Sequence, residues 1–65
     1  MSTTRKEIER FVVAHNKYLK EVVQQMSLIE LLRNLHPLYR TDYAYRLRKE
    51  KLITDIQTLE FVKML

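Results

Sequence analysis

The sequence has no cysteine, no glycine and no tryptophan, and its only proline is Pro37. Without cysteine there are no disulfides and no thiolate metal sites, and the two histidines, His15 and His36, are too far apart in sequence for a typical zinc motif. Without glycine we do not expect β-hairpin turns or phosphate-binding loops, because both use backbone conformations that glycine adopts at little cost. These absences favour helices joined by few connections.

The chain of 65 residues is long enough for one domain at most, which we assign to residues 1–65, and its own core is marginal. Since disulfides and metals are excluded, association with another chain is the remaining means of stabilisation. No apolar run reaches the ~20 residues of a membrane span, and the N-terminal residues lack the pattern of a signal peptide. We therefore expect an intracellular, cytoplasmic protein without membrane contact, which forms a homodimer or binds a protein partner.

The first half of the chain has the pattern of a long helix. Apolar residues recur every three or four positions over residues 8–26, the spacing of one helix face. Thr4 and Glu7 have the spacing of a capping box, which predicts that the helix begins there. His15 lies on the apolar stripe. We interpret it as a residue at the edge of a helix interface, with a pH switch or a ligand contact as the alternative.

Ser27 and Glu30 repeat the capping-box spacing, which leaves two interpretations open. Either a new helix begins there, or one long or bent helix continues until Pro37 ends it. We favour the long or bent helix, because the apolar stripe continues past this point. The segment 28–35 is apolar nearly all round, which is typical of a helix covered on more than one side.

The residue pattern in the second half of the chain predicts one more helix. We expect residues 38–40 to form the connection, Thr41 or Asp42 to cap the helix, and the helix to run to near the C-terminus. Thr54 and Gln57 offer a further start, with a kink before them. The predicted fold class is therefore all-α: a helical hairpin with a long or bent first helix, which completes a helical bundle by dimerisation and contains two to four helices.

The surface expected to bind a partner is apolar. The Leu-rich segment 28–35 and the apolar residues near the C-terminus exceed what one hairpin can cover. The residues predicted to contact a partner are Leu28, Leu31, Leu32, Leu35, Phe61 and Leu65.

Basic and aromatic residues are concentrated between positions 39 and 51. Five of the twelve basic residues and two acidic ones fall in residues 40–51, so this stretch carries +3 of the net charge of +4. Arginine binds phosphates and carboxylates, tyrosine stacks on bases, and both are frequent at protein hot spots. The residues predicted to contact a nucleic acid or an acidic partner are Tyr39, Arg40, Tyr43, Tyr45, Arg46, Arg48, Lys49 and Lys51. The alternative is that they form a solvated helix face.

Part of this stretch resembles a known family. The segment Thr41-Asp-Tyr-Ala-Tyr-Arg-Leu-Arg-Lys49, with Thr58-Leu-Glu60 and Val62 further on, is similar to the opening segment of the Hha/YmoA family of nucleoid-associated modulators. The resemblance covers about a third of the chain and needs an insertion between its two parts, so no binding residue is carried over. It implies a role in modulating DNA-bound regulators.

No group of residues has a catalytic pattern. There is no cysteine nucleophile, the two serines stand at predicted helix starts, and the carboxylates are scattered among basic residues. We expect no enzyme activity, cofactor, metal or small-molecule substrate. Two functions stay open. The favoured one is a small helical interaction protein that binds and regulates a larger protein or assembly; the alternative is a small basic nucleic-acid-binding or nucleoid-associated regulator that uses residues 40–51.

Overall fold

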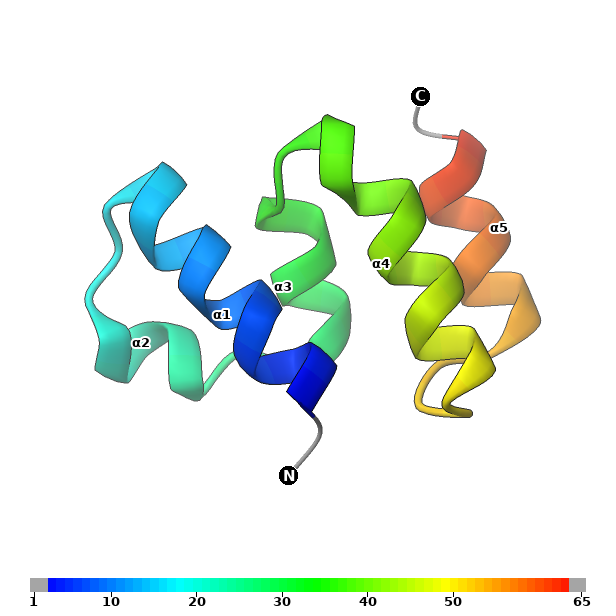
Figure 1. Ribbon diagram of the computed structural model, residues 1–65, viewed down its shortest axis with the longest axis horizontal. Helices are drawn as coiled ribbons and strands as arrows, with labels where there is room; N and C mark the ends of the chain where they lie inside the picture. Colours follow the sequence, from blue (N-terminus) through cyan, green and yellow to red (C-terminus); the bar gives the residue numbers. More distant parts are fainter. Residues whose placement is uncertain (1–2, 64–65) are drawn as a thin grey trace.

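The computed structural model describes residues 3–63, most of which lie in five helices. These are α1 (Thr3–Asn16), α2 (Lys20–Gln24), α3 (Leu28–Asn34), α4 (Pro37–Lys49) and α5 (Asp55–Lys63). Residues 3–63 contain no strand, so the predicted all-α class is confirmed. Figure 1 shows α1 and α2 on one side, the antiparallel pair α4 and α5 on the other, and α3 between them.

The molecule is flat, with Cα extents of 29 × 25 × 14 Å. Packed helix axes lie about 8–10 Å apart and Cα atoms lie about 2.3 Å from each axis, so the short dimension corresponds to two helix layers. A two-layer arrangement of short helices leaves each of them with a face toward solvent.

The core lies where α1, α3 and α4 meet, and α5 closes one end of it. Its buried apolar side chains are Ile8, Val12, Val23, Leu31, Leu32, Leu35, Tyr43, Ala44, Leu47, Ile53 and Phe61. The segment 28–35 is covered on more than one side, as predicted. The covering elements are helices of the same chain, α1, α4 and α5.

The predicted long first helix is wrong, because α1 ends at Asn16. Lys17 takes a φ of 58°, and its backbone N–H donates to the carbonyl of Val13 at 2.9 Å. This is a left-handed helix C-terminus, in which the residue after the cap is usually glycine. A straight helix would hold Val12 and Leu31 about 28 Å apart at 1.5 Å per residue, whereas the broken chain brings both into one core.

The start of α3 at Leu28 confirms the alternative interpretation of the Ser27 and Glu30 spacing. The Ser27 hydroxyl accepts the backbone N–H of Glu30 at 3.2 Å and donates to the Glu30 carboxylate at 3.3 Å. The first capping box is wrong. Thr4 is buried within α1, and its hydroxyl donates to the carboxylate of Glu50 beyond the end of α4.

The start of α4 lies earlier than predicted. Pro37 occupies the first turn, where its missing N–H and restricted φ are tolerated, and Nδ1 of His36 accepts the backbone N–H two residues on at 3.1 Å. The predicted connection over 38–40 and the predicted caps at Thr41 or Asp42 are therefore wrong, since all these residues lie inside the helix. The prediction that the preceding helix ends before the proline is confirmed.

A second left-handed lysine separates α4 from α5. Lys51 has a φ of 62° and donates its N–H to the carbonyl of Arg48 at 2.9 Å, while the N–H of Leu52 donates to the carbonyl of Leu47 at 2.9 Å. These two bonds form a Schellman motif. The absence of glycine did not prevent left-handed turns; lysine adopts them here at a cost of about 1–2 kcal/mol each.

The start of α5 confirms the further helix start expected at Thr54 and Gln57. The Thr54 hydroxyl accepts the N–H of Gln57 at 3.1 Å, and the Gln57 side chain accepts the N–H of Thr54 at 2.9 Å. The chain breaks after α1, α2, α3 and α4, so residues 3–63 contain five helices, more than the predicted two to four. Among the described residues no helix is both long and apolar enough to cross a membrane.

Candidate interaction site

The apolar residues predicted to contact a partner lie mostly inside the protein. The fully or almost fully buried ones are Leu31, Leu32, Leu35 and Phe61. Leu28 packs half-buried against the same core, and Leu65 lies outside the described residues. A partner has no access to the buried four, so in this structure they stabilise the fold of their own chain instead of forming an interface.

Arg40 also has a structural role instead of the predicted contact with nucleic acid. Its residue exposure is only 9%, and its guanidinium donates from Nε to the carbonyl of Leu32 at 3.2 Å and from Nη2 to the carbonyl of Leu35 at 3.1 Å. These carbonyls stand at the C-terminus of α3, where a helix leaves acceptors without partners and where its dipole favours a cation. Arg40 therefore fixes the end of α3 from a position inside α4.

Tyr43 and Arg46 join α4 to α1. Tyr43 is buried, the Arg46 guanidinium carbon lies 4.9 Å from the centre of its ring, and Arg46 pairs with Glu7 of α1 at 2.9 Å. Burial raises the pKa of the Tyr43 hydroxyl above its ordinary value of 10.0, and the charge of Glu7 raises it further while that of Arg46 lowers it. Of these two residues of the predicted basic surface, Tyr43 is buried in the helix packing, whereas the Arg46 side chain stays about half exposed while it pairs with Glu7.

The rest of the predicted basic surface is accessible. Tyr39, Tyr45, Arg48, Lys49 and Lys51 are exposed, and Arg48 lies 3.7 Å from the carboxylate of Asp55 and 5.9 Å from the Tyr45 ring. Of the predicted contact residues, Arg40 and Tyr43 are therefore buried, and the others, including Arg46, are exposed.

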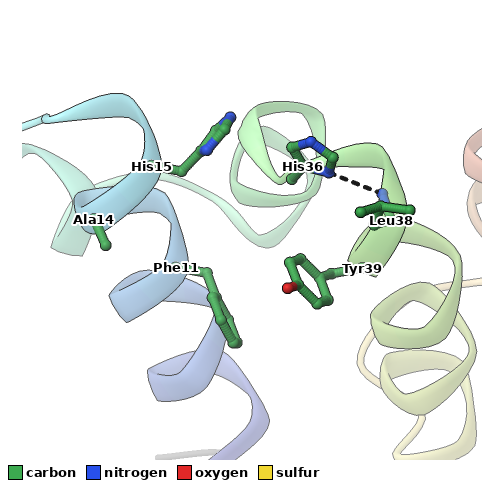
Figure 2. A pocket seen from close by; sticks show the side chains of 6 residues that line it. All are labelled: Phe11, Ala14, His15, His36, Leu38 and Tyr39. Atoms are coloured by element: carbon green, nitrogen blue, oxygen red, sulfur yellow. Dashed lines mark hydrogen bonds between the residues drawn. The ribbon is translucent and has the colours of Figure 1, made fainter.

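An aromatic hollow lies between α1 and the start of α4 (Figure 2). Phe11 stacks on Tyr39 with ring centres 5.0 Å apart and planes at 19°, and His15 meets His36 edge to face with ring centres 5.0 Å apart. These rings, with Ala14 and Leu38, line an open hollow of about 450 Å³. No carboxylate, ammonium or guanidinium group lines it, so its walls are largely apolar.

The histidine pair in this hollow is poorly suited to hold a metal ion. Nδ1 of His36 accepts the N–H of Leu38, so in the neutral imidazole the proton is on Nε2, which then has no free lone pair. Residues 3–63 also contain no group of three histidine, cysteine, aspartate or glutamate side chains that could bind a metal. The pair instead shapes the hollow, and His36 caps α4.

The outer face of α5 is a second apolar surface. Ile56 is 71% exposed and Leu59, one helical turn further on, is 55% exposed, while Thr58 and Phe61 on the inner side are buried. Leu52, just before the helix, is exposed as well. The outer side of α5 therefore carries two exposed apolar side chains next to the exposed Glu60, while Phe61 on the inner side packs into the core.

Sequence patterns did not single out these surfaces. Phe11, Ile56 and Leu59 continue the three-and-four spacing of core residues, so the pattern alone assigns them to the inside. The hollow joins residues that are more than 20 positions apart in the chain, and nothing local indicates that Phe11 and Tyr39 meet. The one local signal for the aromatic hollow was Pro37, which indicates the end of a helix close to the aromatic residue Tyr39.

Comparison of this chain with protein-family models, with curated proteins and with solved structures finds no match. The local resemblance of residues 41–49 to the Hha/YmoA family thus has no counterpart in a matching family model. Fold and surface together describe a small all-helical protein with apolar side chains exposed at the aromatic hollow and on the outer side of α5.

Proposed function

We propose that this protein is a small non-enzymatic interaction protein that binds and regulates a larger protein. The observation that carries this proposal is the aromatic hollow of Figure 2, bordered by Leu38, which is 76% exposed. Protein interfaces are enriched in aromatic residues and depleted of charge at their centre, and the walls of the hollow have that composition. Exposed apolar surface of this kind favours a partner that covers it.

The proposed occupant of the hollow is an apolar side chain of the partner protein. The stacked rings of Phe11 and Tyr39 provide a rigid wall, and rigid aromatic walls are suited to an anchor residue. A nucleic-acid strand would bring phosphates, which bind lysine and arginine side chains, and neither residue type lines the hollow.

We also propose that the protein forms a homodimer through the outer face of α5. Ile56 and Leu59 would pack on the same residues of a second copy, so that two antiparallel α4–α5 pairs complete a four-helix bundle. This surface and the aromatic hollow are different parts of the molecule, so dimerisation leaves the hollow accessible to the partner.

The experiment is affinity capture of the partner with the wild-type protein and two matched variants. Leu38→Asn removes the apolar rim of the hollow, and Leu19→Asn makes the same change at a residue of similar exposure before α2. We expect the wild type to capture its partner protein at moderate salt and Leu19→Asn to bind that partner equally well. The affinity of Leu38→Asn for the same partner should be about tenfold or more weaker. Equal binding by both variants, or equal loss, would contradict the proposal.

Nucleic-acid binding is the alternative, favoured by the exposed Arg48, Lys49 and Lys51 at the end of α4. It predicts an affinity that falls steeply with salt, because each neutralised phosphate releases counterions. Replacement of the three cations by alanine would then reduce the salt dependence along with the affinity. No binding to duplex or single-stranded nucleic acid at low salt would eliminate this alternative.

A further inference from the structure

A second hollow, of about 750 Å³, lies between α1 and α2. Its floor is apolar and consists of Val13 and Ala14 of α1 and the fully buried Val23 of α2. The exposed side chains of Lys6, Arg10 and Lys20 line its rim. We call this feature the α1–α2 groove.

One end of the groove is held in place by Arg5. Its Nε lies 3.0 Å from the Glu9 carboxylate, and its Nη2 donates to the carbonyls of Gln24 at 3.2 Å and Met26 at 2.6 Å. These contacts connect α1 to the end of α2 and to the residues after it. They also occupy Glu9, which is the only carboxylate in the lining.

The other cations of the groove are Lys6, Arg10 and Lys20. Over residues 3–63 no ion pair involves Lys6, Arg10 or Lys20. Lys6 and Arg10 lie one turn apart on α1, where two like charges disfavour the helix by a few tenths of a kcal/mol. Positive charges gathered over an apolar floor create a local potential that attracts an anion.

The shape of the groove limits the ligand. A bare phosphate ion would meet the cations but leave the floor in water, and a neutral apolar molecule would cover the floor but leave the cations unpaired. The volume falls within the roughly 300–1,000 Å³ of sites for organic ligands. With five residues, α2 is only about 7.5 Å long, too short to support a second helix or a nucleic-acid strand.

We propose that the α1–α2 groove binds a small organic anion, in which a carboxylate, sulfonate or phosphate group is joined to an aromatic or alkyl body. The body lies on Val13 and Ala14, next to the buried Val23. The anionic group lies between the side chains of Lys6 and Arg10 on α1 and the facing Lys20. This site adjoins the aromatic hollow at Ala14, which lines both, but it uses none of the rings of that hollow and no residue of α5.

The test is an NMR titration of ¹⁵N-labelled protein with three probes. The first is 8-anilinonaphthalene-1-sulfonate, the second is N-phenyl-1-naphthylamine, which has the same rings without the sulfonate, and the third is inorganic phosphate. We expect the sulfonate to shift the amide signals of Val13 and Val23, neither of which lines the aromatic hollow, and to bind about tenfold more tightly than the neutral amine. Phosphate alone should leave these floor signals in place.

Two double variants carry the same change of charge at different places. Lys6→Gln with Arg10→Gln alters the groove, and Lys49→Gln with Lys51→Gln alters the end of α4, where both lysines are equally exposed. We expect the groove variant to bind the sulfonate about tenfold more weakly and the control variant to bind it as the wild type does. The native NMR spectrum of each variant confirms that it is folded.

Three results would overturn the proposal. Equal weakening in both variants would show that only the overall charge matters. Shifts confined to Phe11 and Tyr39, or to Ile56 and Leu59, would show that the dye binds another apolar surface. Phosphate that shifts the floor signals with the same affinity as the sulfonate would show that the organic body contributes nothing.

Discussion

Helices α1, α3 and α4 form the body of the protein, and α5 packs at its C-terminal end. Both regions have the same apolar spacing, but the apolar residues are covered to different extents. In the body, Val12, Leu32 and Leu47 repeat at helical spacing within their elements and are fully buried. In α5, Ile56 and Leu59 have the same spacing and are more than half exposed. The difference shows that periodicity locates an apolar face, while the number of neighbouring helices decides whether that face is covered. Only the uncovered face is available to a partner.

The largest expected effect separates the two regions directly. Leu32→Ala should lower the free energy of unfolding by about 2–5 kcal/mol, because it leaves a cavity in the body. At concentrations where the protein is monomeric, Ile56→Ala should change it by no more than about 0.5 kcal/mol, because the side chain is then mostly in water. Urea denaturation of both variants measures the difference. A similar loss in both would mean that α5 is as well covered as the body.

The next effect tests whether the basic stretch belongs to the body. Arg40→Gln removes the charged donors from the α3 carbonyls and should cost about 1.5–3 kcal/mol of stability. Arg48→Gln, at a half-exposed position in the same helix, should stay within about 0.5 kcal/mol of the wild type. If the two variants unfold at the same denaturant concentration, the assignment of Arg40 to the end of α3 is wrong.

A gain in stability of about 1 kcal/mol is expected at the connection between the body and α5. Lys51→Gly relieves the left-handed backbone, which a side chain disfavours. Lys51→Ala serves as the control, since alanine keeps the Cβ atom and should give no such gain. Thermal unfolding of the two variants is the measurement. A lower melting temperature for the glycine variant would indicate that the lysine side chain itself holds the turn.

A change confined to alkaline solution is expected at Tyr43. The pKa of Tyr43 is higher in the folded protein than in the unfolded chain. As the pH rises above 10, the unfolded chain therefore loses this proton first, and the folded state becomes less stable relative to it. The contribution is complete below the unfolded pKa and disappears as the pH passes the folded pKa. Tyr43→Phe should flatten this part of the stability curve above pH 10. Parallel curves for wild type and variant would contradict the effect.

The smallest effect on stability is expected for a variant of the outer face of α5 that changes the oligomeric state. Ile56→Gln with Leu59→Gln should alter the free energy of unfolding of the monomer by no more than about 1 kcal/mol, because both side chains are exposed. Light scattering should show a dimer for the wild type and a monomer for this variant. A wild-type monomer that stays fully folded at micromolar concentration would rule out the dimer.

Local signals in the sequence located several helix boundaries correctly. Ser27 caps α3, Thr54 caps α5, and α3 ends before Pro37. Each of these boundaries depends on residues next to each other in the chain, so it can be predicted from the sequence. The left-handed lysines were not predictable, because a non-glycine residue adopts this conformation only when the surrounding packing compensates for it. The long first helix failed for the same reason.

The candidate surfaces were less predictable than the helices. The arginine that ends α3 and the arginines on the outside of α4 have identical local chemistry, and only their position relative to other helices distinguishes them. The aromatic hollow and the α1–α2 groove each combine side chains from two helices, so neither exists in the pattern of a single one.

The sequence by itself determined the all-helical class, because apolar spacing, caps and the single proline act over a few residues. The tertiary structure decided which apolar residues became core, which arginine became buried and which rings and cations meet at a surface. The physical reason is that these outcomes depend on contacts between distant segments, where burial and charge pairing outweigh the local preferences.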